Sequence, residues 1–72
     1  MNTIDHVLNS MQVHFDVLMD CFVREHRTAK YGKLSDNPYF EEVKALVDSM
    51  NVLRKYLGWE IITLKQEVQY RL

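Results

Sequence analysis

Three histidines and a single cysteine are the residues of this sequence best suited by type to ligate a metal or attack a substrate. His6 and His14 are eight residues apart, so on a helix their side chains diverge by roughly 80°. Neither these residues nor His26 forms the Glu-x-x-His pair used in di-iron helical bundles, and Cys21 has no second cysteine beside it. We therefore expect no metal site and no cofactor, with Cys21 acting as a small apolar residue of the core.

Glu41 and Glu42 form the adjacent acidic pair that would suggest general acid–base chemistry. Neighbouring carboxylates on a helix point about 100° apart, and acidic residues are favoured in the first turn of a helix without any catalytic role. The sequence has no Ser-His-Asp or Cys-His spacing and no glycine-rich phosphate loop. We expect a protein that is not an enzyme.

Four basic residues recur at every third position: Arg24, Arg27, Lys30 and Lys33. Such a row can follow the phosphates of a nucleic acid. The same row is explained by the negative end of a helix and by an acidic start of the next helix. Helix-turn-helix spacing is absent, so we prefer a protein–protein role. Nucleic-acid binding is kept as the alternative.

Apolar residues at helical spacing predict an all-α fold with two long helices that position these side chains. The first helix covers about residues 3–31, the second about 38–70, and a turn at 32–37 joins them. A turn this short predicts an antiparallel helical hairpin. Charge favours the same orientation, because it brings Asp16 and Asp20 of the first helix towards the basic end of the second, which includes Arg71.

Residues that cap helices mark the expected ends. Asn2 or Thr3 can cap the first helix, and Gly32 suits the left-handed position beyond its C-terminus. Asn37 is the expected N-cap of the second helix. Gly58 lies inside the second helix, at a cost of about 1 kcal/mol relative to alanine. A bend or break at Gly58 would create a third short helix, but we favour one continuous helix.

Length and composition limit the chain to one domain, residues 1–72, without disulfides. Hydrophobic residues make up 47% of it, and no run approaches the 18 apolar residues that a membrane span needs. The N-terminus lacks the basic start and apolar stretch of a signal peptide. We expect a cytoplasmic protein that does not enter the membrane.

A hairpin of this size cannot bury all of its apolar surface. The apolar arc of the first helix spans about 200°, which is wider than one neighbouring helix covers. Domains of this length usually need an additional source of stability, and we expect neither disulfides nor a metal site to provide it here. We therefore expect dimerisation to complete the core as a four-helix bundle.

The second helix carries a further apolar seam opposite its core side. Val52, Tyr56, Trp59 and Tyr70 fall within roughly 60° of one another on a continuous helix, together with Ala45 and Thr63. Tryptophan and tyrosine dominate the energetics of protein interfaces. We interpret this seam as an oligomer or partner interface rather than as ordinary surface aromatics.

By size and hairpin layout, the chain resembles the short helical-hairpin regulators of phages and mobile elements, such as antirepressors. The resemblance implies a partner that is a transcriptional regulator and an outcome in which that partner is inactivated. It matches no signature residues, so it assigns no site. Small helical secretion chaperones have a similar layout, which leaves a chaperone or assembly subunit as a further alternative.

Overall fold

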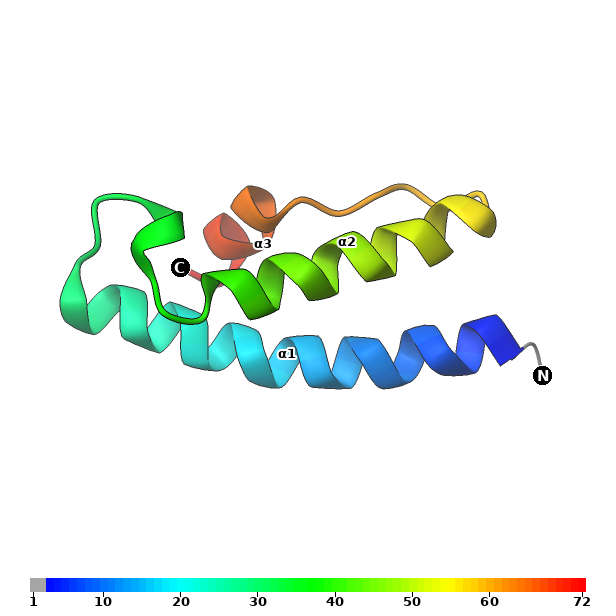
Figure 1. Cartoon of the computed structure of the whole chain (residues 1–72), viewed down its shortest axis with the longest axis horizontal. Coiled ribbons are helices and arrows are strands. Elements are labelled where there is room, and N and C mark those ends of the chain that lie inside the picture. The colour runs from blue at the N-terminus through cyan, green and yellow to red at the C-terminus, as the bar shows by residue number, and fades with distance from the viewer. Residues whose placement is uncertain (1–2) are drawn as a thin grey trace.

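The computed structural model describes residues 3–72 as three α-helices and a short 3-10 helix. In chain order these are α1 (Thr3–Ala29), η1 (Leu34–Asp36), α2 (Phe40–Tyr56) and α3 (Leu64–Arg71). No strand occurs in this part of the chain. The all-helical class is therefore confirmed, but the second long helix is not continuous: α3 folds back beside α1 and α2 (Figure 1).

The core lies where the apolar stripes of α1 and α2 face each other along antiparallel axes (Figure 1). Five large side chains are almost completely buried there: Phe15, Met19, Phe22, Val43 and Met50. Burial of a side chain of this size contributes roughly 1.5–3 kcal/mol. The packing of α1 on α2 therefore supplies most of the hydrophobic stabilisation.

The connection between α1 and α2 runs from residue 30 to residue 39, which is longer than the predicted turn at 32–37. Lys30, with φ of 55°, occupies the left-handed position after α1, and its N–H donates to the carbonyl of His26 at 3.0 Å. Gly32 does not have a positive φ. Its predicted role is therefore wrong, because α1 ends two residues earlier than expected and Lys30 closes the last turn. Asn2, one of the two expected caps of α1, lies outside the described residues.

Asn37 ties the start of α2 to α1. Its Oδ1 accepts from the N–H of Tyr39 at 2.9 Å, and its Nδ2 donates to the carbonyl of Phe22 at 2.9 Å. The regular helix begins at Phe40, after a turn in which the Phe40 N–H donates to the Asn37 carbonyl. Asn37 is only 3% exposed, so these hydrogen bonds satisfy a polar group that would otherwise be costly to bury.

Gly58 ends α2 instead of continuing it. The Trp59 N–H donates to the Arg54 carbonyl at 2.8 Å, and the Gly58 N–H donates to the Lys55 carbonyl at 3.1 Å. This pair of bonds defines a Schellman motif, which requires a left-handed residue at the position of Gly58, whose φ is 76°. The continuous helix over 38–70 was therefore wrong, because glycine is better suited to ending a helix here than to lying inside one.

An extended segment, residues 59–63, returns along α2 and leads into α3. The side-chain amide of Asn51 both donates to the carbonyl of Ile62 and accepts from its N–H, each at 2.8 Å. Arg54 Nε donates to the Glu60 carbonyl at 2.6 Å. Asn51 and Arg54 thus satisfy backbone N–H and carbonyl groups of a segment that forms no regular helix or strand of its own.

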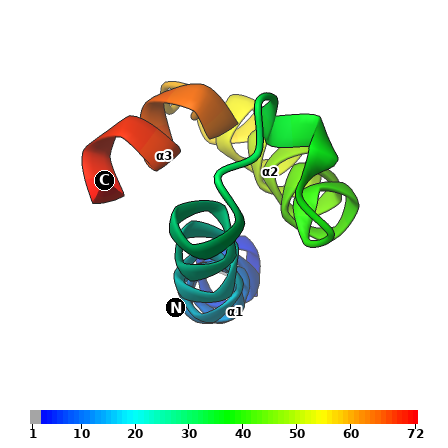
Figure 2. The same ribbon diagram turned by 90° about the vertical axis from the view of Figure 1, so that its left-hand side faces the viewer.

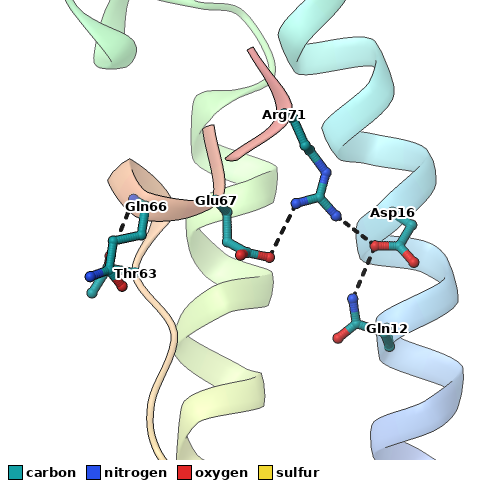
Figure 3. Close-up of polar contacts among 6 residues, drawn as sticks. All are labelled: Gln12, Asp16, Thr63, Gln66, Glu67 and Arg71. Carbon is teal, nitrogen blue, oxygen red and sulfur yellow. Dashed lines mark hydrogen bonds and ion pairs between the residues drawn. The ribbon is translucent and has the colours of Figure 1, made fainter. Parts of the chain in front are cut away.

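Thr63 caps α3, and its Oγ1 accepts from the Gln66 N–H at 3.3 Å (Figure 3). Seen along α1, the three helices lie at the corners of a triangle, with α3 on one side of the α1–α2 pair (Figure 2). Val68 is the buried residue of α3. The attachment of α3 to the other helices therefore depends on polar contacts as well as on the burial of Val68.

Candidate functional site

The predicted apolar seam is divided between two ends of the molecule. Val52 and Tyr56 lie one turn apart on the outer face of α2 and are 67% and 76% exposed. Trp59, 48% exposed, follows the helix, whereas Tyr70, 88% exposed, lies on α3. Because the chain reverses at Gly58, α3 returns towards the C-terminal half of α1 (Figure 1). Tyr70 there lines a pocket with residues of α1 and not with Val52, Tyr56 or Trp59. A single four-residue seam is therefore wrong.

Val52 and Tyr56 share the outer face near the C-terminal end of α2, and Trp59 follows that end; we call these three residues the aromatic end. Trp59 is held there by its backbone bond to the Arg54 carbonyl. The guanidinium carbon of Arg54 also lies 5.6 Å from the centre of the Trp59 ring, which is a cation–π contact. Arg54 is itself fixed by its bond to Glu60. The tryptophan is thus held in place from two directions.

The predicted basic row is divided as well. Arg24 and Arg27 line a pocket of about 570 Å3 between α1 and α3, whereas Lys30 and Lys33 lie in the connection after α1. We call this cavity the arginine pocket. Seven residues line it: Asp20, Val23, Arg24, Arg27, Thr28, Tyr70 and Arg71. The pocket therefore brings Arg24 and Arg27, two of the four basic residues, beside Tyr70.

Arg71 is the residue that fastens α3 to α1. Its guanidinium donates to Asp16 at 2.8 Å and to Glu67 at 3.1 Å (Figure 3). It also lies over the ring of Phe15, 5.5 Å from the centroid. The Asp16 carboxylate accepts a further bond from Gln12. Asp16 thus contacts the basic C-terminal region, through the third short helix that the sequence allowed but that we did not favour.

The other two arginines of the pocket have no carboxylate partner within residues 3–72. Arg27 donates to the backbone carbonyl of Arg71 at 3.2 Å, which orients its side chain across the boundary between α1 and α3. Arg24 is exposed and forms no ion pair. Thr28 donates its hydroxyl to the Arg24 carbonyl at 2.9 Å. The pocket lining therefore carries three guanidinium groups and one carboxylate, that of Asp20.

A second, shallower hollow lies between α1 and α2 and is lined by different residues. It measures about 290 Å3, and we call it the open groove. Its lining is His14, Leu18, Glu42, Ala45, Leu46 and Ser49. None of these residues lines the arginine pocket, and no residue of α3 reaches the groove. Leu18 and Leu46 pack against the core but are only partly buried.

Tyr31, in the connection after α1, has a perturbed pKa. Its hydroxyl donates to Glu25 Oε1 at 2.9 Å, and this hydrogen bond to the glutamate raises the pKa of Tyr31 above its ordinary value of 10.0. The His26 ring lies between those of Phe22 and Tyr31, at centroid distances of 5.9 and 6.0 Å. These contacts hold the connection after α1.

Within residues 3–72, no three metal-ligating side chains come together. Over the same range, no helix combines the length and the apolar character needed to cross a bilayer. Glu41 and Glu42 occupy the first turn of α2, as expected. These carboxylates thus have a helix-stabilising position.

Sequence reasoning missed Asp20, Thr28 and Arg71 as members of a common site, because it placed residue 71 at the far end of a straight helix. Two signals pointed to the return of the chain. Gly58 suits the left-handed position that ends a helix, and Thr63-Leu64-Lys65-Gln66 matches the Ser/Thr-x-x-Glu/Gln pattern of a helix start.

Comparisons with protein-family models, with curated proteins and with solved structures found no match to this chain.

Proposed function

We propose that this protein is a non-enzymatic interaction module that self-associates and binds a regulatory protein, which it inactivates. The observation that carries the proposal is the aromatic end, where Val52, Tyr56 and Trp59 present apolar surface to solvent. Tryptophan and tyrosine are the side chains most enriched among residues that dominate binding energy.

The aromatic end suits binding because its central residue is already ordered. Trp59 is fixed by a backbone hydrogen bond and by the Arg54 guanidinium, so it loses little conformational entropy when a partner covers it. Its exposed half still offers apolar area, worth roughly 25 cal/mol per Å2 when buried. Val52 and Tyr56 add exposed apolar area on the outer face of α2.

Self-association is supported by apolar surface that α3 leaves uncovered. Val13 and Val17 lie one turn apart on α1 and are 66% and 58% exposed. The open groove leaves Leu18 and Leu46 partly uncovered on a separate side of the α1–α2 pair. A second copy that covers either surface brings two α1–α2 pairs together as four long helices, with the two α3 helices outside them. Sedimentation at micromolar concentration should show a dimer or larger species, and a monodisperse monomer would contradict this part of the proposal.

The proposal that the partner is a transcriptional regulator rests on the resemblance to short helical-hairpin regulators. The alternative, a nucleic-acid-binding regulator that uses Arg24, Arg27, Lys30 and Lys33, predicts a steep fall of affinity for nonspecific DNA as salt rises. A chaperone or assembly subunit would bind several unrelated clients. The three functions therefore differ in measurable properties.

The direct test compares single alanine variants as bait in co-purification from the native cell. Trp59→Ala and Tyr56→Ala should each weaken recovery of the same partner, because loss of a central aromatic commonly costs 2 kcal/mol or more, about thirtyfold in affinity. Tyr70→Ala is the matched control, since it removes an equally exposed tyrosine at the other end of the molecule.

Circular dichroism should show unchanged helical content for Tyr56→Ala, whose side chain is mostly in solvent. A partner recovered equally well by wild type, Trp59→Ala and Tyr56→Ala would contradict the assignment of the aromatic end. Loss of recovery with Tyr70→Ala alone would transfer the interface to α3.

A further inference from the structure

The arginine pocket brings together positive charges that are far apart in the sequence. Arg24 and Arg27 come from the second half of α1, and Arg71 comes from the last turn of α3, yet all three line one cavity of about 570 Å3. Like charges brought together in a concave site repel one another and concentrate a positive field there. An arrangement of this kind is stabilised when an anion enters.

The three guanidinium groups are not equally available. Arg71 is engaged by Asp16 and Glu67, so its charge is compensated within the protein. Arg27 contributes one hydrogen bond to a backbone carbonyl, which fixes its position without neutralising it. Arg24 has no ion-pair partner within the described residues. Among the described residues, two guanidinium groups without an ion-pair partner, one turn apart on α1, therefore remain for a ligand, and one carboxylate of the lining, Asp20, lies on the same helix.

Complementarity with the helix dipole accounts for only part of this arrangement. Arg27 lies in the last turn of α1, where a cation is favoured by the partial negative charge of the helix end. Arg24 lies before that turn, and the dipole effect falls off within a single turn. The position of Arg24 beside Arg27 and Arg71 is thus not explained by the helix end.

We propose that the arginine pocket binds a small organic molecule through its phosphate group. Guanidinium groups bind phosphate through paired N–H···O bonds, and two arginines without ion-pair partners offer two sets of N–H donors to its oxygens. The cavity is within the 300–1,000 Å3 range typical of ligand pockets. It is larger than a phosphate ion alone requires, which leaves room for an organic body.

The remaining lining suits that organic body. Tyr70 presents an exposed ring that can cover a planar or apolar group. The Asp20 carboxylate accepts hydrogen bonds, so it favours hydroxyl or amino groups on the ligand and disfavours a second phosphate on its side. A bound phosphate group offers three acceptor oxygens to the two arginines, whereas a carboxylate offers two, which is why phosphate is the better fit.

The test follows the arginine Nε–H signals by nuclear magnetic resonance during titration at constant ionic strength. The probes are phenyl phosphate, inorganic phosphate and acetate. Saturable shifts are expected for Arg24 and Arg27, with phenyl phosphate binding most tightly and acetate at least about tenfold more weakly than inorganic phosphate. Arg54, whose Nε–H donates to Glu60 outside the pocket, is the internal control and should not shift.

Two variants distinguish binding at the arginine pocket from a general effect of the positive charge of the protein. Arg24→Gln should weaken phenyl phosphate binding about tenfold, the effect of losing about 1.4 kcal/mol of interaction. Lys65→Gln removes an exposed charge of α3 that does not line the pocket and should change nothing. The proposal is overturned by shifts that do not saturate, by equal affinity for acetate and inorganic phosphate, or by equal effects of the two variants.

Discussion

Different kinds of interaction stabilise the α1–α2 pair and the segment 57–72, which we call the return. Between α1 and α2, large apolar side chains such as Phe22, Met19 and Met50 are almost completely buried. In the return, Val68 is the buried apolar residue, and individual polar groups fix the path: the Asn51 amide, the Thr63 cap and the Arg71 guanidinium.

This difference determines how each region responds to change. Apolar burial is spread over many contacts and tolerates adjustment, whereas a hydrogen bond depends on one donor and one acceptor in a defined geometry. We therefore expect the return to be lost in steps, by single substitutions that leave α1 and α2 paired. Both the arginine pocket and the position of Trp59 depend on this weaker region.

The largest effect is expected in the α1–α2 core. Phe22→Ala removes a fully buried ring and should lower the free energy of unfolding by about 3–5 kcal/mol, a large part of the stability of a small domain. Urea denaturation followed by circular dichroism measures the change. Ser10→Ala, at an exposed position on the same helix, should stay within about 0.5 kcal/mol of wild type. Similar losses for the two variants would show that this core is not organised as described.

A smaller and local effect is expected from Asn51→Ala. It removes both hydrogen bonds to Ile62, and leaving such groups unpaired costs roughly 1–3 kcal/mol. Hydrogen exchange should lose protection in residues 59–71 and keep it in α1 and the first turns of α2. Asn9→Ala is the matched control, since Asn9 is exposed and has no side-chain hydrogen bond in the described structure. Protection that is unchanged in the return would rule out the Asn51 clamp.

The smallest effect is expected from a pair of glycine substitutions. Gly58→Ala meets no atom within 4 Å, so its cost is the left-handed conformation itself, about 1–2 kcal/mol. Gly32→Ala is equally free of contacts and has no positive φ, so it should be neutral or slightly stabilising. Thermal unfolding by circular dichroism compares the two. Equal melting temperatures would contradict the Schellman motif at Gly58.

The sequence was sufficient for the part of the fold that depends on apolar periodicity. The buried residues of α1 and α2 recur three or four positions apart, as in Phe15, Met19 and Phe22 or in Val43, Val47 and Met50, since helical spacing determines which side chains can be buried together. Val23 is a buried residue that the sequence did not predict. The path after Gly58 was not predicted, because Leu64 and Val68 also fit the stripe of a longer helix. The choice between the two depended on a cap, a glycine conformation and the Asn51 clamp, which periodicity does not detect.

The candidate site was predicted only where it lies on continuous helix. Val52 and Tyr56 share a face of α2 as expected, and Arg24 and Arg27 share a side of α1. The meeting of Arg24, Arg27, Tyr70 and Arg71 requires the chain to reverse, so spacing along one helix could not show it. Sites built by chain reversal need the turn to be recognised first.

The position of α3 beside α1 is the central claim, and a paramagnetic label on α1 tests it directly. A nitroxide attached to Thr28→Cys, with Cys21 replaced by Ser, should strongly broaden the amide signals of residues 68–72, because Thr28, Tyr70 and Arg71 line the same pocket. A continuous helix over 38–70 would extend about 50 Å from the turn, at 1.5 Å per residue, and carry those residues far from the label. Broadening of residues 68–72 is the predicted result, and unaffected signals there would contradict the three-helix fold and the pocket it forms.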